Sequence, residues 1–315
     1  MLKRIRRSDV CVGMYIDDIE GTDGRSLGLV VSRATVADIH ERNLFSSIID
    51  TSRGRDVAVS DEQSAAGSVP PATLACHGNP SRHDVARARR VPASTKPIMG
   101  KMFSDARLGK AVQFNDAAKA VDQIISTLDE NPIALIEVTR LRSKDENSFL
   151  HSIGVSTLMI HFGRWLGHDP MAVRLLGVSG LVHDIGKMAL PSSLLQKAGS
   201  LTGDELAQVR THPSEGHALL ARHGTMPNVV MEICLNHHER LDGTGYPRGI
   251  AQNEISKAVR IASICDVYDA MTTIRPYKRA WSPTEAFSSM FRSEGQFDRQ
   301  LLWQFIQCLD HPGGP

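Results

Sequence analysis

The sequence predicts a mainly α protein, in which an all-α C-terminal domain follows a small α/β module and a flexible linker. Short β-like runs alternate with turn residues over the first 57 residues, a stretch without hydrophobic period follows, and apolar residues then recur at helical spacing from about residue 97 onward. The 315 residues, 41% of them hydrophobic and 23% charged, are typical of a globular protein of about two domains.

The N-terminal part divides into two segments. Residues 1–57 hold β-like runs at 10–16, 27–31 and 47–50, with a short helix expected at 34–42. Residues 58–96 are rich in Ser, Pro, Gly and Arg, and such a composition buries too little apolar surface to offset the entropy of ordering. We therefore expect a small α/β module and then a flexible linker.

The C-terminal part reads as helical throughout. Residues 97–145 are expected to form connecting helices, among them 117–128 and 133–141, with Asn131 as an N-cap before Pro132. Residues 146–315 form the main domain. Two four-residue segments that begin at Thr202 and Ser282 match the capping box and mark helix starts.

Charge and cysteine usage exclude several classes of protein. A formal net charge of +1 provides no global field for DNA, so no DNA partner is expected. No run of about 18 apolar residues exists, and no apolar segment of the signal-peptide kind follows the basic start. The five scattered cysteines form no C-x-x-C pair, which argues against a disulfide framework and a thiolate zinc site. A cytoplasmic protein without a membrane partner is expected.

Histidines and aspartates gather on the predicted helices of the main domain. His151 is in phase with apolar residues of its helix, and Asp269 follows Asp266 one turn later on an apolar helix. Buried carboxylates are costly unless paired or metal-bound. Seven candidate ligands converge from five helices: His151, His183, Asp184, His212, His237, His238 and Asp266. Imidazole with carboxylate suits iron, manganese or zinc. Seven ligands are too many for one ion but fit two ions that share a bridging carboxylate.

Four ordered motifs resemble the HD-GYP subgroup of the HD phosphohydrolase superfamily over roughly residues 145–305. They are His183-Asp-Ile-Gly-Lys187, His237-His-Glu-Arg-Leu-Asp-Gly-Thr-Gly-Tyr-Pro247, Asp266-Val-Tyr-Asp-Ala-Met271 and Arg275-Pro-Tyr-Lys278. The first module, with Val12-Gly-Met-Tyr15, resembles a small domain of unknown function found ahead of such domains. The resemblance implies an HD-type helical fold and a metal-dependent phosphodiesterase that hydrolyses cyclic di-GMP to pGpG or GMP. It also implies second-messenger signalling in biofilm formation and motility, with diguanylate cyclase (GGDEF) proteins as partners.

The resemblance also implies a role for each motif residue. One metal, iron or manganese, would be held by His151, His183, Asp184 and Asp266, and a second by Asp184, His212, His237 and His238. Asp184 and Lys187 would be catalytic, with Lys187 on the attacked phosphate. The remaining substrate contacts would come from Gly243, Gly245, Tyr246, Pro247, Asp269, Arg275 and Lys278. Some family members carry a glutamate that binds a third metal where this chain has Asn147, so two metals are expected.

Three alternatives stay open at this point. The first is a catalytically silent receptor for the dinucleotide, although every implied ligand and Lys187 are present. The second is an HD nucleotidase for a mononucleotide, which the loop at 243–247 and the pair Arg275 and Lys278 disfavour. The third is a phosphodiesterase for cyclic GMP-AMP, which the motifs do not separate from one for cyclic di-GMP.

Overall fold

The computed structural model divides the chain into two compact units, 1–81 and 82–315. It describes residues 2–6, 14–19, 28–30, 46–50, 82–140, 147–197, 199–222, 226–273 and 280–310. Within these ranges no helix has the length and apolar character needed to cross a membrane.

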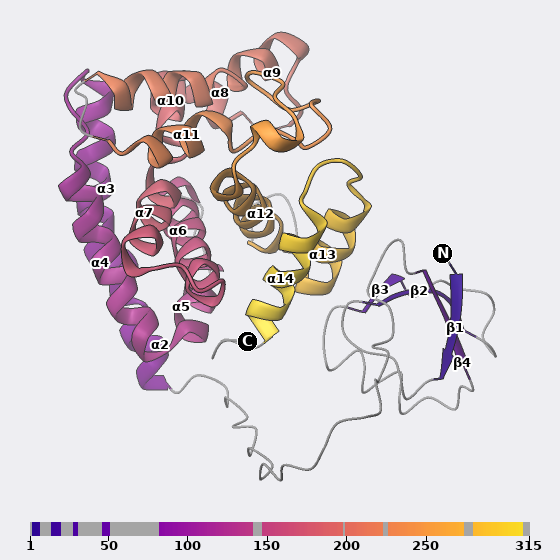
Figure 1. Ribbon diagram of the computed structural model, residues 1–315. Helices are drawn as coiled ribbons and strands as arrows, with labels where there is room; N and C mark the ends of the chain where they lie inside the picture. Colours follow the sequence, from indigo (N-terminus) through magenta and orange to yellow (C-terminus); the bar gives the residue numbers. More distant parts are fainter. Residues whose placement is uncertain are drawn as a thin grey trace. The chain divides into compact units, whose positions relative to one another are not determined.

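The N-terminal unit holds a four-stranded antiparallel sheet, drawn in indigo in Figure 1. Its strands lie in the order β1-β4-β2-β3, where β1 is Leu2–Arg6, β2 Tyr15–Ile19, β3 Gly28–Leu29 and β4 Ser46–Asp50. Ile16 of β2 is fully buried, as expected for a residue on the inward face of a strand whose other face is exposed. The basic strand β1 was not expected, because its two apolar residues do not alternate with polar ones. The helix expected at 34–42 lies outside the described residues.

The predicted linker is wrong in its C-terminal part. Residues 82–96 are helical, in α2 (Arg82–Ala88) and the first turns of α3 (Arg90–Arg107). Val91, Thr95 and Met99 lie one turn apart on α3 and are buried. The Thr95 hydroxyl donates to the Val91 carbonyl at 2.6 Å, so this polar side chain can belong to the buried face. The many arginines hid that face, because Arg87, Arg89 and Arg90, in α2 and at the start of α3, are exposed and dominate the local composition.

The helical unit otherwise follows the expected order. Pro132 begins α5 after the cap at Asn131, whose Oδ1 accepts from the Ala134 amide at 3.0 Å. Both predicted capping boxes are present, at Thr202 and at Ser282. The helices that follow α3 are α4 (Phe114–Glu130), α5 (Pro132–Arg140), α6 (Asn147–Trp165), α7 (Pro170–Val182), α8 (Ser192–Leu195), α9 (Gly203–Val209), α10 (His212–Ala221), α11 (Asn228–Asn236), α12 (Lys257–Thr272), α13 (Pro283–Arg292) and α14 (Arg299–Asp310).

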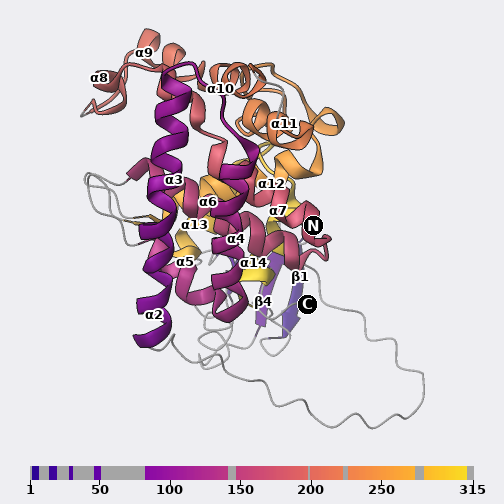
Figure 2. The same ribbon diagram turned by 90° about the vertical axis from the view of Figure 1, so that its left-hand side faces the viewer.

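Helices α6 and α7 form the centre of this unit, with α3 and α4 along one side and α12 to α14 on the other (Figure 1 and, from the side of α3 and α4, Figure 2). Gly180 of α7 allows the two central helices to approach closely, since an added Cβ would lie 2.6 Å from the Ser156 Cα of α6. The Ser156 hydroxyl also donates to the Gly177 carbonyl at 2.8 Å. This contact sets the spacing between the ends of α6 and α7, where the first histidines of the site lie.

Candidate metal centre

Five helical elements and one short 3-10 segment, η3 (Ile185–Ala189), bring the seven predicted ligands together. Asp184 comes immediately before η3, and His212 is the first residue of α10. Gly186 lies against α10, where a Cβ would overlap the His212 carbonyl oxygen and the Gly216 amide. Only glycine therefore lets η3 reach α10 and place Asp184 beside His212.

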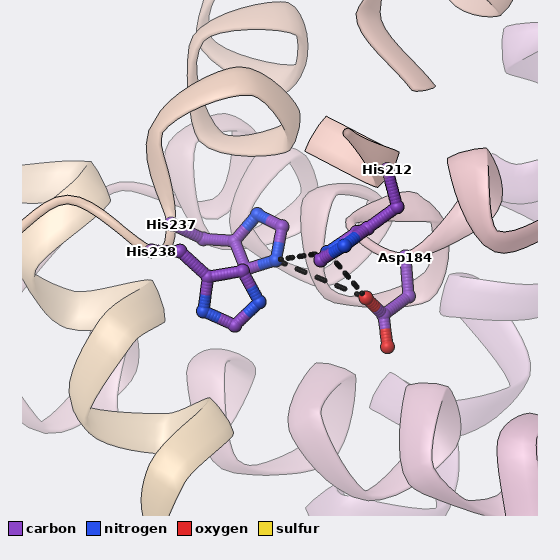
Figure 3. Close-up of side chains that lie close together, drawn as sticks. All are labelled: Asp184, His212, His237 and His238. Atoms are coloured by element: carbon purple, nitrogen blue, oxygen red, sulfur yellow. Dashed lines mark hydrogen bonds and ion pairs between the residues drawn. The ribbon is translucent and has the colours of Figure 1, made fainter. Parts of the chain in front are cut away.

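The ligands form two adjacent groups. His151, His183 and Asp266 make one, and Asp184, His212, His237 and His238 make the other; within each group the candidate ligand atoms lie within 4.8 Å of one another. Figure 3 shows the second group, in which three imidazoles and a carboxylate face a common centre.

Asp184 lies between the two groups and presents one oxygen to each. Its Oδ2 lies 3.7 Å from His151 Nε2 and 3.4 Å from His183 Nε2. Its Oδ1 lies 3.2 Å from His212 Nε2 and 3.8 Å from His237 Nε2. A single carboxylate thus contacts ligand atoms on both sides of the cluster.

Backbone carbonyls fix how the imidazoles face the centre. The Nδ1 atoms of His183, His212 and His237 lie 2.8 to 3.1 Å from carbonyl oxygens of the preceding turn. In that arrangement the proton of a neutral ring sits on Nδ1 and donates outward, and the Nε2 lone pair points inward. This is the form of histidine that binds metal through Nε2.

The inward atoms suit a cation. His212 Nε2 and His237 Nε2 approach to 3.4 Å, so two lone pairs face each other across the site (Figure 3). His183 Nε2 and Asp184 Oδ1 are buried and make no hydrogen bond to any residue that the structure describes. Buried polar atoms without partners are costly, and divalent cations held by the two groups would satisfy these atoms. The donor set of neutral imidazole and carboxylate therefore fits a divalent metal centre.

Burial and neighbouring charges set the protonation of the site. Burial lowers the pKa of His238 to about 4 and holds the pKa of His237 well below its usual range. Although burial alone would raise the pKa of Asp184, the charges of Lys187 and His183 hold it well below its usual range. At neutral pH His237 and His238 are therefore neutral imidazoles, and Asp184 is an ionised carboxylate.

His151 behaves differently, because two carboxylates contact its ring. Burial opposes protonation, but hydrogen bonds to Asp266 and Asp269 raise the pKa of His151 to about 9. Its Nε2 lies 3.0 Å from Asp266 Oδ1, and its Nδ1 lies 2.7 Å from Asp269 Oδ2. A cation bound between His151 and Asp266 would take the place of the Nε2 proton.

Asp269 was predicted to contact the substrate. Its carboxylate contacts the Nδ1 side of the His151 ring, behind the candidate ligand atoms. Its side chain is 2% exposed, and its carboxylate accepts from the ring of His151 on the side away from Asp184 and Asp266. With a metal bound to His151, it would orient that histidine in the way typical of carboxylate–histidine–metal arrangements. The sequence could not predict the contact with His151, because spacing places Asp269 on the same helix face as Asp266 but does not reveal which atom it contacts.

Lys187 reaches the centre from η3. Its Nζ donates to Asp184 Oδ2, and its side chain is 30% exposed, so the ammonium lies at the boundary between the ligands and solvent. The predicted ligands and Lys187 are thus gathered in one place. Arg275 and Lys278, the predicted clamp on the rest of the substrate, lie outside the described residues.

The loop after α11 covers one edge of the site. Gly243 has a φ of 77°, and a Cβ on Gly245 would lie 2.5 Å from the Glu239 Cα, so both glycines are required where the sequence placed a tight loop. The Tyr246 ring stacks on His238 with centroids 4.8 Å apart. Glu239 Oε1 accepts from the amides of Arg248 at 2.7 Å and Gly249 at 3.2 Å, which anchors the loop.

Arg210 is the residue near the site that sequence reasoning missed. Its guanidinium lies 5.2 Å from the centre of the Tyr246 ring. The only sequence signal was its position two residues before His212, which does not indicate a role.

The helical unit and its His/Asp cluster define the class of protein: an all-α domain whose ligand set fits a divalent metal centre of the kind that hydrolyses phosphate esters. Two family models match the chain: the HD domain over residues 122–301 and a domain of unknown function, DUF3391, over residues 2–117. The chain belongs to the HD domain family and has an N-terminal DUF3391 domain. The DUF3391 match extends past residue 81, so it includes α2 and α3 of the helical unit.

Curated relatives and one solved structure are similar to the chain. A cyclic di-GMP phosphodiesterase of Pseudomonas aeruginosa is 37% identical over an alignment of 319 residues. The alignment covers 98% of this chain and 77% of the relative. A 3'3'-cGAMP-specific phosphodiesterase of Vibrio cholerae is 35% identical over 191 residues, 60% of this chain and 43% of the relative. An HDG"Y"P protein from Bdellovibrio bacteriovorus has the same fold, with a TM-score of 0.61 at 19% identity over 98% of this chain and 99% of that one.

Proposed function

We propose that the protein is a metal-dependent phosphodiesterase that hydrolyses cyclic di-GMP to pGpG or GMP. The observation that carries the proposal is Asp184, whose two oxygens face two separate groups of inward-pointing ligand atoms. The relative from Pseudomonas aeruginosa, which matches nearly the whole chain and is named for this activity, supports the substrate.

The proposal assigns two cations, iron or manganese. One would be held by His151, His183, Asp184 and Asp266, the other by Asp184, His212, His237 and His238. Bound there, two divalent cations supply activation of a water molecule and neutralisation of charge on the attacked phosphate. Asp184 would bridge them, since its oxygens lie 3.2 to 3.8 Å from ligand nitrogens on both sides.

Residues around the cluster would bind and orient the substrate. Lys187 holds an ammonium beside Asp184, where it would stabilise negative charge that develops on the phosphate oxygens. The loop with Gly243, Gly245, Tyr246 and Pro247 would form one wall of the substrate site. We further propose Asp269 as a positioning residue that acts through His151. The roles of Arg275 and Lys278, the cytoplasmic location and the GGDEF partners stay predictions.

A second substrate is supported by a specific observation. The relative from Vibrio cholerae is named for 3'3'-cGAMP and matches 60% of this chain. It matches less of the chain than the cyclic di-GMP relative does, so we rank cyclic di-GMP first. A silent receptor is the alternative from another class of function.

The test is hydrolysis of both dinucleotides by protein purified anaerobically and loaded with Fe(II) or Mn(II), with products separated by chromatography. Metal-dependent appearance of pGpG or GMP with a higher kcat/KM than for 3'3'-cGAMP supports the proposal. Binding of cyclic di-GMP without any product would identify a receptor. A higher kcat/KM for 3'3'-cGAMP would assign the second substrate.

A further inference from the structure

Arg210 places a positive charge beside the loop that covers the metal centre. It lies in the turn between α9 and α10, and its guanidinium carbon is 5.2 Å from the centre of the Tyr246 ring. The same ring stacks on His238, with centroids 4.8 Å apart and planes inclined by 26°. His238 belongs to the second ligand group. The guanidinium is therefore held one aromatic ring away from the metal ligands.

This charge has no acidic counterpart in the part of the chain that the structure describes. Other arginines of the helical unit pair with aspartates: Arg174 with Asp122 at 2.7 Å and Arg240 with Asp242 at 2.8 Å. Arg210 is exposed, and no described carboxylate lies within ion-pair distance of it. Its five N–H donors are thus available to an anion, while its position over the Tyr246 ring limits where the group can point.

A cyclic dinucleotide carries two phosphates, and only one of them is attacked at the metal centre at a time. The cations and Lys187 would contact the attacked phosphate, and the predicted clamp for the rest of the substrate, Arg275 and Lys278, lies outside the described residues. Arg210 is a described residue that offers an exposed guanidinium beside the loop that would form one wall of the substrate site. A guanidinium can donate two parallel hydrogen bonds to one phosphate, and hydrogen bonds between charged groups are stronger than those between neutral groups. We propose that Arg210 is a substrate-binding residue that holds the phosphate that is not attacked. This inference rests on the proposed function and deepens it.

The alternative role for Arg210 is purely structural. Through Tyr246, it could fix His238 and so act on the metal centre. The two roles differ in substrate dependence, because a small diester with a single phosphate, bis(p-nitrophenyl) phosphate, needs the metal centre but has no second phosphate to offer.

The experiment compares the Mn(II)-loaded full chain with Arg210→Gln, Arg210→Lys and the control Arg174→Gln. For Arg210→Gln we expect KM for cyclic di-GMP to rise about tenfold with little change in kcat, as for loss of one exposed charge-assisted contact. The KM of Arg210→Lys should fall between those of the wild type and Arg210→Gln, because lysine keeps the charge and lacks the planar guanidinium. Hydrolysis of bis(p-nitrophenyl) phosphate, manganese content and the Arg174→Gln control should stay unchanged.

Two results would overturn the inference. One is an unchanged KM for cyclic di-GMP in Arg210→Gln. The other is an equal loss on both substrates or a loss of manganese, which would make Arg210 a support for His238. Equilibrium binding of cyclic di-GMP, measured by calorimetry, separates this inference from the proposed function. Without turnover in the wild type, weaker binding by Arg210→Gln would support the inference while the proposed function fails, and no binding by the wild type would overturn both.

Discussion

Asp269→Asn should weaken the binding of one divalent cation, although Asp269 is not itself a predicted ligand. Asp269 Oδ2 accepts from His151 Nδ1 at 2.7 Å in a buried position. Asparagine has nearly the same shape and can still accept that bond, so the substitution removes the negative charge and little else. A neutral acceptor makes the imidazole a weaker electron donor to a cation on its Nε2.

The expected loss of metal affinity can be estimated from the hydrogen bond between Asp269 and His151. A hydrogen bond to a charged group contributes roughly 1.5–3 kcal/mol and a neutral one roughly 0.5–1.5 kcal/mol. The difference, about 1–1.5 kcal/mol, corresponds to about a tenfold loss of affinity. Asp269→Ala removes the acceptor altogether, and the loss should approach about a hundredfold.

The assay is a Mn(II) titration of the metal-free protein, followed by the electron paramagnetic resonance signal of free Mn(II). Asp122→Asn is the matched control, since its carboxylate pairs with Arg174 on the surface of the same unit. In Asp269→Asn, one class of sites should bind Mn(II) with lower affinity than in the wild type. In the control, the affinity of both classes should be unchanged. Overlapping titrations of Asp269→Asn and wild type, together with a raised KM for cyclic di-GMP, would refute this reasoning and return Asp269 to the substrate site.

Four further predictions concern the centre and its loop. Asp184→Ala should lose bound metal and turnover together, because one carboxylate faces both ligand groups. Lys187→Ala should keep its metal content and lower kcat by about a hundredfold. Gly245→Ala should lower the free energy of unfolding by about 1–3 kcal/mol, because the new Cβ meets backbone atoms at 2.5 Å. Because the pKa of His151 is raised to about 9 without metal, Mn(II) affinity should rise with pH, up to about tenfold per unit, between pH 7 and 9.

Each of these has a decisive measurement. Elemental analysis and cyclic di-GMP turnover test the first two, and Asp184→Ala protein that retains both would remove Asp184 from the bridging position. An unchanged kcat in Lys187→Ala would exclude Lys187 from charge stabilisation. Thermal denaturation tests Gly245→Ala, for which Gly203→Ala is the control, because an added Cβ there meets no atom within 4 Å and its φ, like that of Gly245, is not positive. Mn(II) affinity that is flat from pH 7 to 9 would contradict proton competition at His151.

Much of the fold could be predicted from local signals. Capping residues at Asn131, Thr202 and Ser282 mark helix starts that the structure confirms. These signals act within one turn, so the sequence contains them completely. The boundary of the linker could not be predicted in this way. Residues 82–96 are helical because Val91 and Thr95 are buried in the core of the unit, and the local composition gives no sign of that burial.

The sequence by itself determined the chemistry of this protein: the ligand types, their motifs and the family to which they belong. The tertiary structure alone decided the geometry. Asp184 faces both ligand groups because Gly180 and Gly186 let helices approach closely, and Asp269 contacts His151, 118 residues earlier in the chain. Arg210, just before α10, meets Tyr246, in the loop after α11, in a fold in which α10 packs against α11. Residue types and spacing are local properties, whereas which atoms meet depends on packing between segments far apart in the chain.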